Sequence, residues 1–188
     1  MITPQPGDFG LVAIKGGVGK LIRIGQWLNG DGFNDYEHAF IYIGEGKIVE
    51  AEPGGALLSD ISGYDGRFIL WSTGLIPLTD IQRSSIIDMA LKQIGTPYSF
   101  LDYFAIALYR VGIRHPKVSD RVISSKHLIC SQLVAQDYAD SGAPVTKYPP
   151  YLVTPGRLAD FLVSFRHTKR LGKMVQKSGS NSINIQIA

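Results

Sequence analysis

Four stretches of the chain group apolar residues in the manner of β-strands. They are residues 9–14 (FGLVAI), 38–43 (HAFIYI), 47–51 (KIVEA) and 67–72 (RFILWS). Each is short, rich in β-branched or aromatic residues, and bounded by glycine or polar residues, which is typical of strands. The pattern predicts a sheet whose middle two strands form a hairpin.

Gly44-Glu45-Gly46 lies between the middle two strands and predicts a three-residue hairpin loop. This loop sets the pairing of the strands: Ile43 with Lys47, Phe40 with Glu50, and His38 with Glu52. Because strand side chains alternate with period two, His38 and Glu50 are then diagonal neighbours on one face. A loop with an even number of residues would instead place His38 and Glu50 on opposite faces of the sheet.

The middle of the chain has helical periodicity. Thr79 and Gln82 have the spacing of a capping box, and they predict a helix that ends at Gly95. Its apolar stripe consists of Ile87, Ala90, Leu91 and Ile94. A second helix, after Tyr98 and ending at Gly112, has an apolar face made of Leu101, Phe104, Ala105 and Leu108.

Two further helices are predicted in the last third of the chain. One begins near Cys130 and ends at Gly142. Thr154-Pro155 has the pattern of an N-cap and first residue of a short helix, whose apolar residues are Leu158, Phe161 and Leu162. Residues 163–170 are predicted to return as a strand. Together these elements indicate an α+β protein with a central antiparallel sheet against which the Cys130 helix packs.

The 188 residues, 45% hydrophobic and 19% charged, suit one globular domain. We assign the domain to residues 1–170 and a basic, polar tail to residues 171–188. From Arg166 onward there are five basic residues and no acidic one, whereas residues 1–165 carry 14 basic and 16 acidic residues. Such a basic end can contact a polyanion, but it is more often a solvated surface, so no specific nucleic-acid binding is expected.

The last residues of the tail alternate between apolar and polar. Ile183, Ile185 and Ile187 are separated by single polar residues, which predicts a short strand over residues 182–188. A lone strand of this length is unstable, so it is expected to pair with an exposed sheet edge. That edge belongs either to its own sheet or to a second copy of the chain, and the latter predicts self-association. A frayed end is the alternative.

Several function classes are not expected from this sequence. Cys130 is the only cysteine, so an intrachain disulfide or a multi-cysteine metal site is excluded. Residues 14–20 (IKGGVGK) resemble a phosphate-binding loop, but Leu21 stands where the motif needs a serine or threonine. The start of the chain lacks the pattern of a secretory signal, and no apolar run reaches the ~20 residues of a membrane span. We therefore expect a cytoplasmic protein without a cofactor.

Cys130 and His38 are the residue types of a thiol nucleophile and its base. A helix N-terminus favours the thiolate form of a cysteine and can also stabilise an oxyanion. Cys130 shares a helix side with Leu133, Val134 and Asp137, which should face the sheet. The alternative is that Cys130 is an inert core residue and His38 an ordinary hydrogen-bonded one. His38, Glu50 and Glu52 can also be considered as zinc ligands, but they lack a ligand pair at helical spacing, so no metal is expected.

Six pieces of the chain occur together in one family. They are Pro6-Gly7-Asp8, residues 37–44 (EHAFIYIG), 48–55 (IVEAEPGG), 95–103 (GTPYSFLDY), 129–142 (ICSQLVAQDYADSG) and 154–160 (TPGRLAD). With the histidine before the cysteine, the chain resembles the circularly permuted NlpC/P60 group of papain-like amidases and peptidases. The resemblance spans roughly residues 5–165.

The resemblance implies a papain-like fold and a role for each matching residue. Cys130 corresponds to the nucleophile, His38 to the base, and Glu50 to the residue that orients the base, with Glu52 as its competitor. Glu37 departs from the family, whose members often carry a small hydroxyl residue there. A carboxylate at this position is expected to raise the pKa of the histidine or to alter substrate choice.

The implied activity is cleavage of an amide through an acyl-enzyme, and the family points to the peptide stems of peptidoglycan. A phage-encoded, virion-associated or delivered protein fits such a substrate. Two alternatives stay open at this point. One is an amidase, thioesterase or acyltransferase that acts on lipid-linked or small amides. The other is a binding or virion structural module that keeps the fold without the chemistry.

Overall fold

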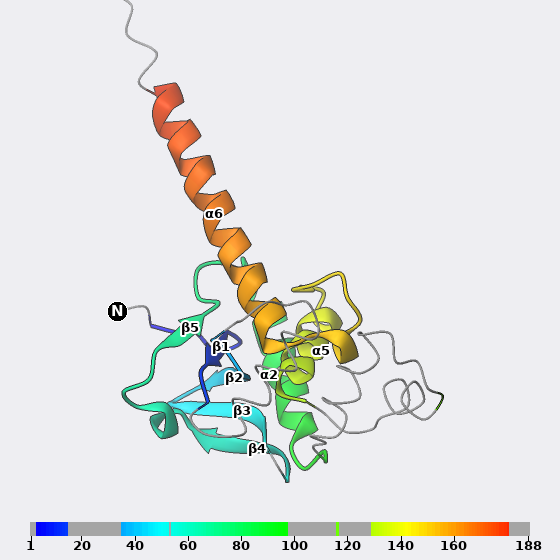
Figure 1. Cartoon of the computed structure of the whole chain (residues 1–188). Coiled ribbons are helices and arrows are strands. Elements are labelled where there is room, and N and C mark those ends of the chain that lie inside the picture. Colours follow the sequence, from blue (N-terminus) through cyan, green and yellow to red (C-terminus); the bar gives the residue numbers. More distant parts are fainter. Residues whose placement is uncertain (1–2, 15–34, 53, 98–115, 117–128, 181–188) are drawn as a thin grey trace, which may run out of the picture.

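The computed structural model describes residues 3–14, 35–52, 54–97, 116 and 129–180, with side chains described as far as residue 167. Its centre is a five-stranded antiparallel sheet in the order β4-β3-β2-β1-β5 (Figure 1). The strands are β1 (Phe9–Val12), β2 (His38–Gly44), β3 (Lys47–Glu52), β4 (Gly55–Asp60) and β5 (Ile69–Trp71). The mixed α+β class and the antiparallel sheet predicted from the sequence are confirmed.

The described residues also form three α-helices and two 3-10 turns. They are the 3-10 turn η1 (Ile61–Tyr64), the α-helices α2 (Asp80–Gln93) and α5 (Cys130–Asp140), the 3-10 turn η2 (Pro150–Leu152), and α6 (Pro155–Ser180). None of these helices combines the length and the apolar character needed to cross a bilayer. The helix predicted after Tyr98 and ending at Gly112, and the terminal strand predicted over 182–188, lie outside the described residues.

The sheet has two differently covered faces. Phe9, Leu11, Ala39 and Ile41 lie on the face that packs against α5, α2 and the start of α6. This main core is completed by helix residues that include Ile86, Leu133, Val134, Tyr138, Leu158 and Leu162. The other face holds a smaller cluster of Val12, Phe40 and Ile48 under Tyr64. The strand pattern of period two therefore sorts side chains onto a helix-covered face and a face that carries His38 and Glu50.

The β2–β3 hairpin reaches the predicted register by a different turn. Phe40 pairs with Glu50 as predicted, but Gly44 rather than Ile43 pairs with Lys47, with a bulge between Tyr42 and Gly44. The loop is thus only two residues long, and both have positive φ, 52° at Glu45 and 73° at Gly46. A two-residue loop alone shifts the register by one, and the extra residue of the bulge restores it. This combination replaces the three-residue loop expected from the sequence.

The predicted capping box of α2 is confirmed, but its predicted stripe is only partly right. Thr79 Oγ1 accepts a hydrogen bond from Gln82 N, and the Gln82 side chain reaches back to the Thr79 N–H. Ile86 and Ala90 are buried, whereas Leu91 and Ile94 are 40% and 41% exposed. The helix is rotated so that Ile86, Ala90 and Gln93, spaced by about one turn each, face α5.

Helix α6 is longer than the short helix predicted, and it includes the residues predicted to form a strand. The N-cap is confirmed, because Thr154 Oγ1 accepts from Arg157 N at 3.2 Å. However, the helix does not stop after Leu162: residues 163–170 continue it, and the strand predicted there is wrong. No proline or glycine follows Gly156 until Gly172, so nothing in the backbone ends the helix at the expected place. The tail predicted from residue 171 begins within the same helix, which extends away from the sheet (Figure 1).

The Pro6-Gly7-Asp8 motif is a structural clamp. Asp8, 1% exposed, forms an ion pair with Arg83 at 2.9 Å and accepts a hydrogen bond from Gln5 N. Gly7 has φ +86°, and its carbonyl accepts from the Tyr138 hydroxyl at 2.7 Å. A side chain at Gly7 would also come within 3.1 Å of the Arg83 backbone. This turn therefore joins the first strand to α2 and α5.

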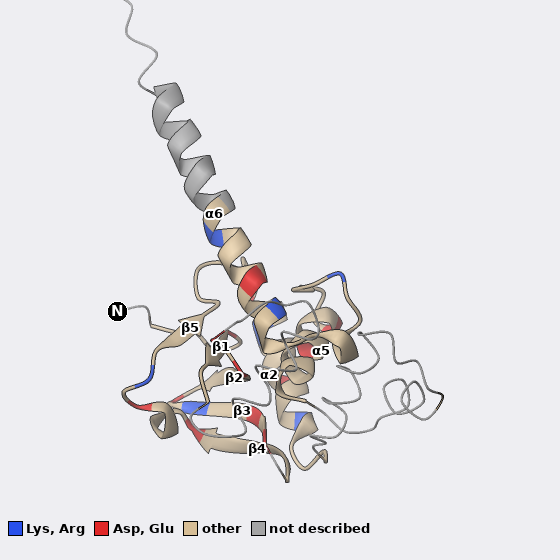
Figure 2. Ribbon diagram, viewed as in Figure 1, with Lys and Arg blue, Asp and Glu red and all other residues tan. Residues whose placement is uncertain are grey.

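Acidic and basic residues are interspersed over the sheet and the helices in the part of the chain that is described (Figure 2). Lys47 and Asp60 illustrate this, since they form an exposed ion pair of 2.7 Å between neighbouring strands. Asp137 on α5 is a buried exception, and its carboxyl accepts a hydrogen bond from the Gln93 side chain. Burial, followed by repulsion from Asp140, raises the pKa of Asp137 to about 8.

Candidate functional site

His38 begins β2 and lies at the centre of the candidate site. It pairs with Val12 of β1 and is 4% exposed. Its Nε2 atom lies 2.7 Å from Oε2 of Glu50, on the neighbouring strand β3. The predicted placement of these two side chains on one face is therefore confirmed. Because an ionised carboxylate only accepts hydrogen bonds, Glu50 places a proton on Nε2.

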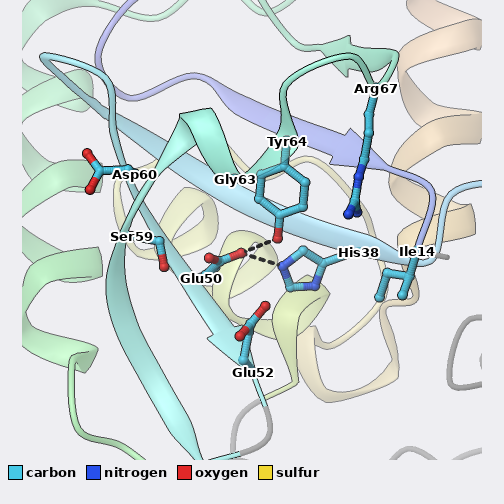
Figure 3. Close-up of a pocket in the computed structure, with 9 residues that line it drawn as sticks. All are labelled: Ile14, His38, Glu50, Glu52, Ser59, Asp60, Gly63, Tyr64 and Arg67. Carbon is cyan, nitrogen blue, oxygen red and sulfur yellow. Dashed lines mark hydrogen bonds and ion pairs between the residues drawn. The ribbon is translucent and has the colours of Figure 1, made fainter. Parts of the chain in front are cut away.

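Glu50 is held by more than the histidine. It is 3% exposed, and the hydroxyl of Tyr64 donates to the same Oε2 atom at 2.5 Å (Figure 3). Burial raises the pKa of Glu50, but hydrogen bonds with His38, Ser59 and Tyr64 outweigh it and hold that pKa below its usual value. The carboxylate is thus ionised although it is buried, which suits an acceptor that must keep the imidazole oriented.

Cys130 is the first residue of α5, and it is 4% exposed. The helix begins as predicted from the sequence, with Ile129 O accepting from Leu133 N at 3.0 Å. Leu133, Val134 and Asp137 are buried on the same side of the helix, also as predicted. The thiol thus lies at the positive end of a helix dipole, where an anion is favoured.

The thiol and the carboxylate both interact with the His38 ring. Burial on its own lowers the pKa of His38, but the side chains of Cys130 and Glu50 outweigh burial and raise that pKa to about 10. Since Glu50 occupies Nε2, the nitrogen left for the thiol is Nδ1. The order of contacts is therefore thiol, imidazole, carboxylate. Such a chain can move a proton from sulfur to nitrogen and keep the resulting imidazolium in place.

A cavity of about 370 Å³ opens beside His38 and Glu50. In Figure 3, Glu52 lies on one side of the imidazole, and Arg67 approaches from the other side. Tyr64, Ser59 and Ile14 also line the cavity. The space is lined by both polar and apolar groups and is large enough for a short peptide or a small amide.

Glu52, the competitor of Glu50, ends β3 and is exposed. Its carboxylate, that of Glu50 and the His38 ring offer ligand atoms that lie within 4.8 Å of one another. This trio resembles a metal-binding group, but the closest pair within it, Nε2 and Oε2, is joined by a hydrogen bond. A metal ion there has to displace that bond.

Glu37 is buried, and one of its oxygens accepts a hydrogen bond from Ile14 N at 2.7 Å. Its backbone N–H bonds to Val12 O. Glu37 therefore ties the end of β1 to the start of β2, next to His38. Its predicted effect on the pKa of His38 stays a prediction.

Tyr64 is the site residue that sequence reasoning missed. It closes η1, which follows β4, and neither element was predicted. Strand β4 begins with a glycine and exposes Leu58, at 47%, and Asp60, so it lacks the strongly apolar character of the other strands. A tyrosine after an unrecognised edge strand carries no signal that places it beside Glu50.

The sequence matches no protein-family model and no curated protein.

Proposed function

We propose that this protein is a cysteine hydrolase with Cys130 as nucleophile, His38 as base and Glu50 as the residue that orients the base. The observation that carries the proposal is the imidazole of His38, which interacts with the thiol of Cys130 and with the carboxylate of Glu50. Three buried polar side chains from three separate elements are costly to bring together for packing alone. A role in proton transfer between the thiol and the imidazole accounts for this arrangement.

The chemistry follows from these contacts. The Cys130 thiol transfers its proton to Nδ1 of His38, and the sulfur attacks the substrate carbonyl to form a tetrahedral oxyanion beside the N-terminus of α5. Collapse breaks the carbonyl–nitrogen bond, and the imidazolium protonates the departing amine. Water, deprotonated by His38, then attacks the thioester and releases an acid and the free thiol. Glu50 stabilises the imidazolium in both halves of the reaction.

The substrate class follows from the resemblance to the circularly permuted NlpC/P60 group, whose papain-like fold we propose for residues 1–170. Two features support this assignment: the cysteine helix packs on an antiparallel sheet, and the histidine begins a central strand that precedes the cysteine in the chain. The substrate we propose is a peptide amide of the peptidoglycan stem. No cofactor is needed for the steps above.

The test combines a thiol-reactive acyl probe with a digest of purified peptidoglycan. Wild type is compared with Cys130→Ala, His38→Ala and, as the matched control, His167→Ala, because His167 is an exposed histidine on α6. Wild type and the control should be labelled and release peptide fragments. Cys130→Ala should do neither, and His38→Ala should do both slowly.

The alternative functions give different outcomes. Labelling without fragment release, together with turnover of small or lipid-linked amides, would replace peptidoglycan as the substrate. Fragment release by Cys130→Ala at the wild-type rate would refute the hydrolase mechanism. A wild-type protein that is neither labelled nor active would point to a binding module.

A further inference from the structure

Tyr64 contacts the acid–base centre, formed by Cys130, His38 and Glu50, through the carboxylate of Glu50. Its hydroxyl donates to Oε2 of Glu50 at 2.5 Å, and His38 Nε2 binds the same oxygen at 2.7 Å. One carboxylate oxygen thus receives both hydrogen bonds. Figure 3 shows the Glu50 carboxylate beside the two rings, with both contacts meeting at that oxygen.

The ring of Tyr64 is also held in place. It stacks on His38 with centroids 6.1 Å apart and an interplanar angle of 27°, and on Phe40 at 5.2 Å and 24°. The guanidinium of Arg67 lies 5.3 Å from the ring centroid. Tyr64 is 9% exposed. A ring fixed from three directions can restrict both the imidazole and the carboxylate.

We propose that Tyr64 is a positioning residue of the acid–base centre, fixing the Glu50 carboxylate and the plane of the His38 ring for proton transfer with Cys130. This inference rests on the proposed hydrolase function and adds a fourth residue to its machinery. The hydroxyl of Tyr64 is directed to Glu50, so it acts through that carboxylate.

The physical reason is the cost of a buried, ionised carboxylate. Glu50 stays ionised only while hydrogen bonds replace the water it has lost, and Tyr64 supplies one of them. Without the hydroxyl, the pKa of Glu50 rises, because one of the hydrogen bonds that lower it is gone. Glu50 becomes protonated at a higher pH, and a protonated carboxyl no longer stabilises the imidazolium. Activity is therefore lost earlier on acidification.

The test substitutes Tyr64→Phe, with Tyr42→Phe as the matched control. Tyr42 lies on β2, and its hydroxyl accepts from Gly46 N at 3.3 Å in the hairpin turn, away from Glu50. Tyr64→Phe should lower kcat about 10- to 100-fold, the loss expected for one hydrogen bond to a charged group, with KM nearly unchanged. Its acid limb should move to higher pH. Tyr42→Phe should keep the wild-type kcat and pH profile.

A double substitution separates positioning from a structural role. In a Glu50→Gln background, Tyr64→Phe should have little further effect on kcat, because the residue it acts through is already altered. Each variant is measured well below its melting midpoint. An equal fold-loss in both backgrounds, or an unchanged acid limb in Tyr64→Phe, would overturn the inference.

A readout that needs no substrate keeps the two proposals distinguishable. The carboxyl carbon of Glu50, followed by NMR across the pH range, should titrate at higher pH in Tyr64→Phe than in wild type, because the carboxylate has lost one of its hydrogen-bond donors. Failure of every substrate would remove the hydrolase proposal but not this effect. Identical Glu50 titration in both proteins would remove the role of Tyr64, whether or not the protein turns over a substrate.

Discussion

Glu50→Gln is the substitution that best separates the orienting role from simple packing. Glutamine has nearly the same shape and can still accept hydrogen bonds from His38 and Tyr64 through its amide oxygen. What it loses is the negative charge that favours a protonated His38. The predicted result is therefore a large loss of turnover with a small loss of stability.

The size of the effect follows from the contact at 2.7 Å. A hydrogen bond to a charged group contributes about 1.5–3 kcal/mol, and a factor of ten in rate corresponds to about 1.4 kcal/mol. Glu50→Gln should therefore reduce kcat by about 10- to 150-fold. Because both partners of the buried oxygen keep an acceptor, the loss in the free energy of unfolding should be ~1 kcal/mol, a shift of about 2–4 °C in the melting midpoint.

The pH dependence gives a second, signed prediction. In wild type, Glu50 helps raise the pKa of His38 to about 10, so the imidazolium persists below that pH. Removing the charge lowers the pKa of His38, and the alkaline limb of activity should move to lower pH.

The matched control is Glu52→Gln, the same chemical change two residues later on the exposed end of β3. Rate, pH profile and melting midpoint are measured for both variants. Equal losses of kcat in both, or a Glu50→Gln enzyme with unaltered rate and alkaline limb, would refute the orienting role.

Three further predictions concern stability. The pKa of the buried Asp137 is raised to about 8, so folding takes up a proton at intermediate pH. The free energy of unfolding should therefore fall between pH ~4 and ~8 and then level off. Melting experiments on Asp137→Asn should show no such fall. Glu45 has φ 52° in the hairpin loop, so Glu45→Asn should raise the melting midpoint, and an unchanged or lower midpoint would contradict the assigned turn. If the predicted terminal strand pairs with a sheet edge, deleting residues 178–188 should lower the melting midpoint or change the mass per particle in light scattering. Truncated and full-length proteins that agree in both quantities would show that the strand does not pair.

The hairpin shows what the sequence could and could not predict. Apolar alternation placed β2 and β3 and brought His38 and Glu50 onto one face, because a period of two leaves only two choices of face. The turn itself was predicted wrongly, since a three-residue loop and a two-residue loop with a bulge give the same pairing of Phe40 with Glu50. Local turn geometry is not determined by the pattern of the strands.

The errors elsewhere have related causes. Val163 and Phe165 alternate with polar residues and therefore resembled a strand, but Leu158 and Leu162 had already committed the segment to a helix that nothing interrupts. Tyr64 was missed because its contact with Glu50 depends on tertiary placement of η1 over the sheet. Long-range contacts made by unpredicted elements leave no periodic trace in the sequence.

The central claim is that His38 and Cys130 act as a coupled acid–base pair, and alkylation of the single cysteine tests it directly. The rate of reaction with iodoacetamide is measured against pH for wild type and His38→Ala. Wild type should be alkylated rapidly well below pH 8, whereas His38→Ala should react more slowly and follow the pKa of an ordinary thiol, about 8.5. Identical profiles for the two proteins, both following an ordinary thiol, would contradict the claim.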